Sequence, residues 1–135
     1  MKAVLKYLPV FLVFGIFVMK GAPSQAQTFG GIIPIKTCMA LKVQSDQAYT
    51  DYQDALSDAE SFSGTFSDCV SEWVEYTNSC SDYSDAYYDW WITCVYPTFK
   101  RPIVAETFRV KVEGRLNAME NDCALDTSDA IVNDC

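Results

Sequence analysis

The fold of this chain is decided by residues 65–96, TFSDCVSEWVEYTNSCSDYSDAYYDWWITCVY, which contain neither glycine nor proline. Cysteines and large apolar residues recur in this stretch at helical spacing: Phe66, Cys69, Trp73, Cys80, Tyr87, Trp91 and Cys94. At about 100° per residue, the three cysteines fall within about 40° of each other, and acidic residues occupy the far side. The pattern predicts one long helix with a core face and a solvated acidic face. Its weakest part is Thr77 to Asp82, where Ser and Asn residues could introduce a kink.

A helix is also predicted before this stretch. Apolar residues recur there in steps of three and four between about residues 36 and 62: Leu41, Ala48, Tyr52, Ala55, Ala59 and Phe62. Acidic residues such as Asp51 and Asp58 fall between them, which gives the period of an amphipathic helix. Gly64 then supplies the left-handed or flexible position at which helices commonly end.

The chain after the long helix predicts a third main helix and a short fourth one. Pro97 ends the long helix, and Pro102 can occupy the first turn of the next. The apolar positions of that helix are Ala105, Phe108, Val112, Met119 and Cys123, although Phe108, Val110 and Val112 also alternate as in a strand. Asp126, Thr127 or Ser128 could cap a short final helix that ends at Cys135. We therefore expect an all-α antiparallel bundle of three main helices plus a short C-terminal helix.

The first 26 residues have the order of a signal peptide. Lys2 and Lys6 precede an apolar run from Tyr7 to Met19, and small and polar residues follow up to Ala26. The expected cleavage site is after Ala26. A membrane anchor is the alternative, but the run of about thirteen residues is shorter than the roughly twenty that a spanning helix needs. We expect residues 27–135 to form a single secreted, extracellular domain.

The mature chain is expected to be strongly acidic. The ten Lys and Arg residues of the sequence include Lys2, Lys6 and Lys20, so seven remain against eighteen Asp and Glu, a net charge of −11. Such a surface should repel nucleic acid and anionic lipid. We therefore expect no nucleic-acid partner, no membrane association after signal cleavage, and a monomer.

Six cysteines predict three disulfides, because an even number in a short exported chain is typical of a disulfide framework. A zinc site would need close ligand pairs or nearby histidines, and the sequence has neither. In a continuous helix, Cys69 and Cys80 lie about 16 Å apart, and Cys80 and Cys94 about 21 Å apart. A disulfide needs Cα atoms within about 7 Å of each other. Each of these three cysteines must therefore pair with Cys38, Cys123 or Cys135.

The expected levels of the helices then choose the pairs. Antiparallel packing brings Cys38 to the level of Cys94 and Cys123 to the level of Cys69. If the tail doubles back after Cys123, Cys135 reaches the level of Cys80. The predicted pairs are Cys38–Cys94, Cys69–Cys123 and Cys80–Cys135.

The sequence offers little catalytic chemistry. It contains no histidine, which removes Ser-His-Asp and Cys-His nucleophiles, and bonded cysteines supply no thiolate. A pair of carboxylates could serve a glycosidase, but the acids fall at outward helical positions, where they favour solubility. We expect no catalytic residues, no metal and no cofactor.

The aromatic residues near the end of the long helix are the candidate contact site. Their density between Trp73 and Phe99 is the most unusual feature of the composition, and the simplest interpretation is a core built from large rings. The alternative is a pocket for an apolar ligand, or an exposed contact patch for a partner. Its residues would be Tyr88, Trp90, Trp91 and Phe99.

Two insect families invite comparison. Insect odorant-binding proteins are lipophile carriers with six cysteines, but they have Cys-x3-Cys and Cys-x8-Cys pairs that this chain lacks. The chain resembles more closely the TsetseEP-type secreted proteins of flies, which are acidic, Tyr-rich helical modules with well-separated cysteines. The residues that carry the resemblance are Cys69, Cys80, Cys94, Tyr76, Tyr83, Tyr87 and Tyr88, with the later Cys123 and Cys135. It implies a secreted, non-enzymatic role in an insect-like fluid such as a gut, salivary or reproductive secretion.

Three functions are compatible with these features. The first is a non-enzymatic extracellular interaction protein that acts through its surface on a protein or a cell. The second is a carrier of a small apolar ligand inside the bundle. The third is a carboxylate-based hydrolase, which would require a pair of acids facing a cleft.

Overall fold

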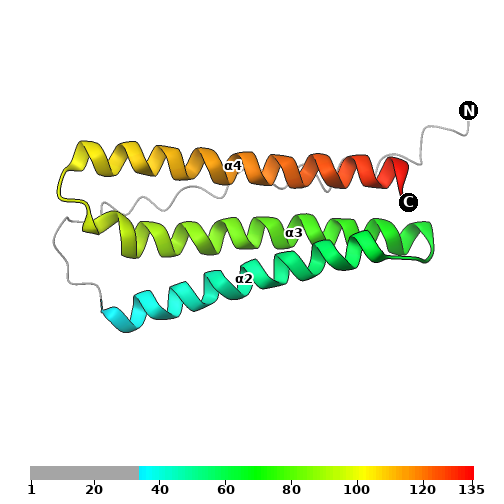
Figure 1. Ribbon diagram of the computed structural model, residues 1–135, viewed down its shortest axis with the longest axis horizontal. Helices are drawn as coiled ribbons and strands as arrows, with labels where there is room; N and C mark the ends of the chain where they lie inside the picture. Colours follow the sequence, from blue (N-terminus) through cyan, green and yellow to red (C-terminus); the bar gives the residue numbers. More distant parts are fainter. Residues whose placement is uncertain (1–33) are drawn as a thin grey trace, which may run out of the picture.

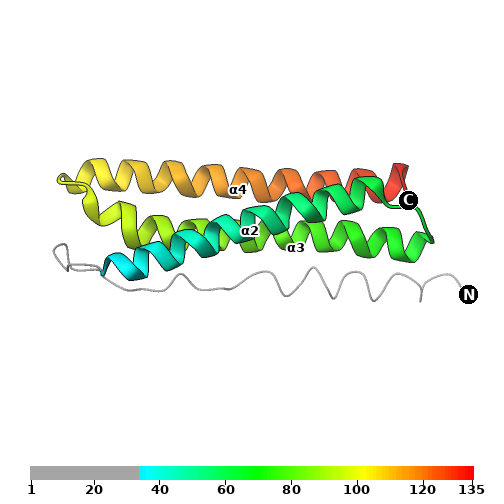
Figure 2. The same cartoon turned by 60° about the horizontal axis from the view of Figure 1, so that its bottom comes forward.

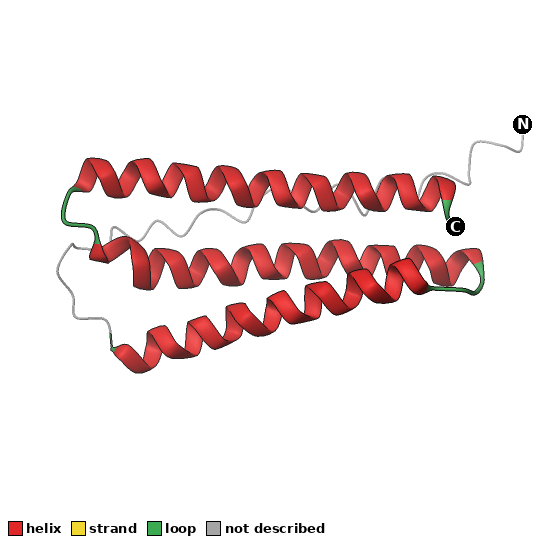
Figure 3. Ribbon diagram, viewed as in Figure 1, coloured by secondary structure: helices red, strands yellow, loops and turns green. Residues whose placement is uncertain are grey.

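The computed structural model describes residues 34–135, which form three long helices joined by short connections (Figure 1; Figure 3). Helix α2 spans Ile35–Ser61, α3 spans Phe66–Trp90, and α4 spans Pro102–Asn133. A π-helical turn, Trp91–Val95, and a 3-10 turn, Tyr96–Thr98, extend α3. The described residues contain no strand, so the all-α prediction is confirmed. Residues 1–33, which include the predicted signal peptide at residues 1–26, lie outside the described residues.

Helix α3 lies between α2 and α4 and packs against both (Figure 1). In the part of the chain that the structure describes, α2 and α4 share no extensive interface. Helix α4 runs alongside α3, whereas α2 is inclined to it, so that the first turns of α2 lie further from α4 than its last turns (Figure 2). No described helix has a stretch that is both long enough and apolar enough to span a membrane.

Helix α3 is continuous through the segment where a kink was possible. It begins at a capping interaction, in which the Thr65 hydroxyl accepts from the Asp68 amide at 3.3 Å and donates to the Asp68 carboxylate at 2.7 Å. Inside the segment, the Thr77 hydroxyl donates to the Trp73 carbonyl and contacts the Thr127 hydroxyl of α4 at 2.6 Å. These bonds occupy the Thr77 side chain without disturbing the helix.

Gly64 is required by the turn between α2 and α3 for a reason that the sequence did not suggest. The Phe62 ring folds back over it, and a Cβ at residue 64 would lie 2.5 Å from the Phe62 Cζ atom. Any larger residue would therefore displace a half-buried ring that packs against the core. Close approach, rather than a left-handed backbone, explains the glycine.

The short fourth helix was a wrong prediction, because α4 continues without a break to Asn133. Thr127, a candidate cap for that helix, is instead buried, and its hydroxyl lies 3.1 Å from the Trp73 carbonyl and 2.6 Å from the Thr77 hydroxyl. The residue is thus used to hold α4 against α3. The strand alternative for Phe108, Val110 and Val112 is also excluded, since all three lie in α4.

One disulfide prediction is confirmed and two are wrong. Cys38 pairs with Cys94, as expected, but Cys69 pairs with Cys135 and Cys80 with Cys123. Two expectations were wrong: Cys123 lies at the level of Cys80 rather than Cys69, and α4 does not turn back after it. Because α4 stays helical and antiparallel to α3, moving forward from Cys123 to Cys135 corresponds to moving back along α3 from Cys80 to Cys69. The inference that no two cysteines of the long helix pair with each other is correct.

The two ends of the bundle differ in packing. We call the end that holds Cys69–Cys135 and Cys80–Cys123 the closed end, because α2, α3 and α4 all contribute to its core. Its buried residues are Ala59, Cys69, Trp73, Tyr76, Cys80, Cys123 and Ala130. We call the other end, which holds Cys38–Cys94, the open end. There, Ile35 is 78% exposed and Ile103 83% exposed.

Candidate functional site

The four aromatic residues predicted to form one contact site lie on two sides of α3. Trp90 points toward α2, where the Lys42 ammonium lies 5.4 Å from its ring centroid. Trp91 is buried and contacts Phe99, whose ring stacks on Phe108 of α4 at 5.2 Å between centroids. The Tyr88 hydroxyl also faces α4. Trp91 and Phe99 are therefore brought together, whereas Trp90 is not part of their group.

The Tyr88 hydroxyl belongs to a polar cluster between α3 and α4. It donates to the Glu113 carboxylate at 2.6 Å, and the Arg109 guanidinium donates to both Glu113 and Glu106. The hydrogen bond from Arg109 lowers the pKa of the Glu106 carboxyl, and burial raises the pKa of the Tyr88 phenol. The arrangement of this cluster is that of a structural ion pair.

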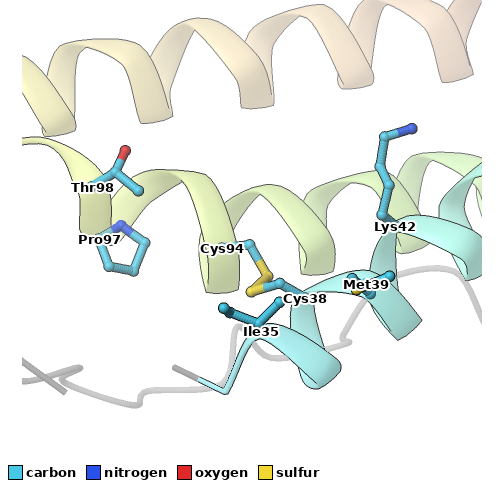
Figure 4. Close-up of a pocket in the computed structure, with 7 residues that line it drawn as sticks. All are labelled: Ile35, Cys38, Met39, Lys42, Cys94, Pro97 and Thr98. Atoms are coloured by element: carbon cyan, nitrogen blue, oxygen red, sulfur yellow. A yellow bond between two sulfur atoms is a disulfide. The ribbon is translucent and has the colours of Figure 1, made fainter. Parts of the chain in front are cut away.

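The open end contains a hollow of about 440 Å³ that the sequence did not predict (Figure 4). The Cys38–Cys94 disulfide and Ile35 lie together on one side of the view, and Pro97 lies across from them. The lining residues are Ile35, Cys38, Met39, Lys42, Cys94, Pro97 and Thr98. The hollow forms here because α2 begins after Pro34, and Pro97 interrupts the end of α3.

An exposed apolar stripe runs from this hollow along α2. Ile35, Met39 and Val43 follow one another at four-residue spacing and are 78%, 64% and 67% exposed. Met39 and Val43 also line a second, open hollow of about 610 Å³ on the outer side of α2. We call Ile35, Met39 and Val43 the α2 stripe. The four-residue spacing of the α2 stripe is visible in the sequence. The stripe lies next to the core face of α2, however, so the sequence pattern alone does not distinguish the two.

The lining of the hollow is mostly apolar. The six cysteines all form disulfides. Among the described residues, no group of three or more His, Cys, Asp or Glu side chains could hold a metal ion. The charged group of the hollow is Lys42, which forms an ion pair with Asp46 one turn later. The site therefore presents aliphatic carbon and sulfur with a cation at its edge.

Comparison with known proteins leaves the function to be argued from these residues. The chain matches no protein-family model, and no curated protein and no solved structure is significantly similar to it.

Proposed function

We propose that this chain is a secreted, non-enzymatic interaction protein that binds a protein or cell-surface partner through the α2 stripe. The observation that carries the proposal is the exposure of Ile35, Met39 and Val43 in one row beside a hollow. Contiguous exposed apolar side chains are typical of interaction surfaces. Three disulfides support an extracellular setting, since such bonds persist in oxidising compartments.

The interior of the bundle argues against the carrier. Where α2 and α3 pack together, Tyr52 stacks on Tyr76 and Tyr83, with ring centroids 5.7 Å and 6.1 Å apart, and Tyr49 lies against Tyr83 at 5.1 Å. These rings and the Cys80–Cys123 disulfide fill the space that an apolar ligand would need. The two hollows described above lie at the surface, where a partner can reach them. The resemblance to TsetseEP-type proteins remains a prediction and agrees with a role in a secreted fluid.

Binding of the labelled, oxidised protein to cells or secretions of the tissue that expresses it tests the proposal. Val43→Asp places a charge in the α2 stripe, and Val74→Asp places the same charge at an exposed position of α3, where Val74 is 44% exposed. We expect Val43→Asp to weaken saturable binding at least about tenfold and Val74→Asp to leave it unchanged. Equal binding by both variants, or no saturable binding of the native protein, contradicts the proposal.

A second measurement separates the interaction protein from the carrier. Native mass spectrometry of the purified protein, combined with displacement of a fluorescent apolar probe, reports any small ligand. We expect neither a co-purified ligand nor saturable probe binding. A stoichiometric, displaceable ligand would instead support the carrier.

A further inference from the structure

Helix α4 packs against α3 with one face, and its opposite face is exposed and uncharged. The face against α3 carries the buried Ala105, Leu116, Cys123, Thr127 and Ala130. The opposite face is a strip about 100° wide at 3.6 residues per turn. We call it the outer face of α4, and it consists of Ile103, Thr107, Val110, Gly114, Asn117, Ala118, Asn121, Leu125, Ser128 and Val132. All ten are exposed, and none is charged, although the sequence contains eighteen acids.

Packing within the chain explains neither the apolar residues nor the glycine of this face. Leu125 and Val132 are 63% and 78% exposed. A Cβ at Gly114 would meet no atom within 4 Å, so the glycine makes room for nothing in its own molecule. Glycine in the middle of a helix is destabilising. Its presence here is explained if something outside the chain approaches the helix closely.

The charges beside the outer face are segregated along the helix. Lys111 and Arg115 lie on one flank in the first half of α4, and Asp122 and Asp129 follow on the same flank in the second half. Lys111 and Arg115 lie one turn apart, where like charges repel, and Asp129 lies close to the C-terminal end of α4, where the helix dipole disfavours an acid. Within residues 34–135, none of these four side chains forms an ion pair.

A second copy of α4, packed antiparallel to the first, brings these charges close to charges of opposite sign. In a two-fold pair of antiparallel helices, each flank meets itself in reversed order. When the residues near 119 lie at the two-fold axis, Arg115 faces Asp122 of the other copy, and Lys111 faces Asp129. The offsets are within about three residues, or about 5 Å of helix rise, which long basic side chains can span. The same register places Leu125 of one copy opposite the open space at Gly114 of the other.

The other flank is compatible with the same register. Glu106 and Glu113 lie there, and both are already bonded by Arg109 of their own chain. In the antiparallel pair these two acids face Ile131 and Ala124 of the other copy. Glu120, on the same flank near the two-fold axis, faces Glu120 of the other copy, and the opposite charges on the first flank must outweigh this repulsion. A parallel two-fold pair would instead join the two different flanks at equal levels, which places Glu113 near Lys111 and Arg115 but sets Glu120 against Asp122.

We infer that the outer face of α4 binds the same face of a second copy of this chain, with Lys111 and Arg115 of each copy opposite Asp129 and Asp122 of the other. This surface is distinct from the α2 stripe of the proposed function, and the dimer departs from the monomer expected from the sequence. The contact uses ten uncharged residues and a few flanking charges per copy, fewer than the 20–30 residues of a standard interface. We therefore expect a weak dimer, with a dissociation constant on the order of 10 µM.

Sedimentation velocity of the oxidised protein between about 1 and 300 µM tests the pairing, because this range spans a dissociation constant on the order of 10 µM. The native chain should shift from monomer to dimer, and the double variants K111E/R115E and D122K/D129K should each pair at least about tenfold more weakly. Mixed together, the two variants should form a heterodimer, and the quadruple swap should restore the homodimer. The heterodimer pairs a wholly acidic flank with a wholly basic one, and the quadruple swap returns each acid to a position opposite a base, which an antiparallel pair predicts.

Two controls keep the outcome decisive. D54K/D58K makes the same change of net charge as D122K/D129K at exposed positions of α2, and it should leave pairing unchanged. Gly114→Gln should raise the thermal stability of the monomer, because nothing lies near its Cβ, and at the same time weaken pairing. A native chain that stays monomeric at about 300 µM, or a dimer that the swaps do not affect, overturns the inference. So does failure of folded variants to rescue each other, with folding checked by circular dichroism.

Discussion

The closed end and the open end are held together in different ways, although the same helices form both. At the closed end, two disulfides lie in a core to which α2, α3 and α4 all contribute, and Cys80 is fully buried. At the open end, a single disulfide joins α2 to the extension of α3, and the first turns of α2 are exposed at Ile35 and Met39. The comparison separates two sources of stability: burial acts mainly at the closed end, whereas the open end depends more on its cross-link.

Removal of one disulfide from each end gives the largest expected effects and the sharpest comparison. Cys38–Cys94 closes a loop of 56 residues, and Cys80–Cys123 closes a loop of 43. Chain entropy alone therefore predicts that removal of either disulfide lowers the free energy of unfolding by about 4 kcal/mol. Cys80→Ala/Cys123→Ala also leaves a cavity in the core, which should bring its loss to about 5–6 kcal/mol. Denaturant unfolding measures both. If Cys38→Ala/Cys94→Ala costs as much as the closed-end variant, the ends do not differ in packing.

Tryptophan truncation compares burial without breaking a cross-link. Trp73 is 7% exposed and belongs to the closed-end core, whereas Trp90 is only half-buried under Lys42. We expect Trp73→Ala to lower the free energy of unfolding by about 4 kcal/mol and Trp90→Ala by about 1–2 kcal/mol. Chemical denaturation followed by circular dichroism avoids reliance on tryptophan fluorescence. A larger loss at Trp90 would reverse the proposed order of the two ends.

The hydroxyl of Thr127 tests whether the closed end also depends on polar contacts. Thr127→Val keeps the shape of the side chain but leaves the Thr77 hydroxyl without its partner across the helices. We expect Thr127→Val to lower the free energy of unfolding by about 1–2 kcal/mol. Thr107→Val is the matched control, because the Thr107 hydroxyl donates only to the Ile103 carbonyl of its own helix. Similar losses from both variants would show that the bridge between α3 and α4 contributes nothing.

Alkaline pH should change the free energy of unfolding least, and we expect this change to arise mainly at the closed end. Burial, followed by hydrogen bonding with Tyr52, raises the pKa of the Tyr76 phenol above its ordinary value of 10.0. A group with a higher pKa in the folded chain stabilises it fully below the unfolded pKa and loses that contribution as pH rises further. Unfolding free energy should therefore fall above about pH 10, and Tyr76→Phe should reduce this fall by about 1 kcal/mol at pH 11. Tyr49→Phe, at a more exposed ring, serves as control. An unchanged pH profile in Tyr76→Phe contradicts the assignment.

Much of the fold could be predicted because periodicity records which side of a helix is buried. The first helix was expected at 36–62 and spans Ile35–Ser61, and Pro102 opens α4 as expected, whereas Pro97 lies inside the 3-10 turn that extends α3 rather than at the end of the α-helix. The disulfide levels were harder, since they depend on where α4 stops. A threonine that caps a helix and a threonine that bridges two helices look the same in sequence, so Thr127 misled the pairing of Cys80 and Cys135.

The candidate site was less accessible to prediction. Neighbouring aromatic residues such as Trp90 and Trp91 project to different sides of a helix, and their numbering alone does not show which helix each one meets. The hollow at the open end depends on the distance between the first turn of α2 and Pro97, which are far apart in sequence. The pattern of residues within one helix gives no information about that distance.

The connectivity of the disulfides has a consequence for proteolysis. The intervals between paired cysteines, 38–94, 69–135 and 80–123, overlap so that every peptide bond from Cys38 to Cys135 lies inside at least one of them. A single cut anywhere in this region, including the exposed turns at residues 63–65 and 100–101, therefore leaves both fragments covalently joined. A protease must cleave more than once, or a reductant must act first, before any piece of the domain between Cys38 and Cys135 can be released.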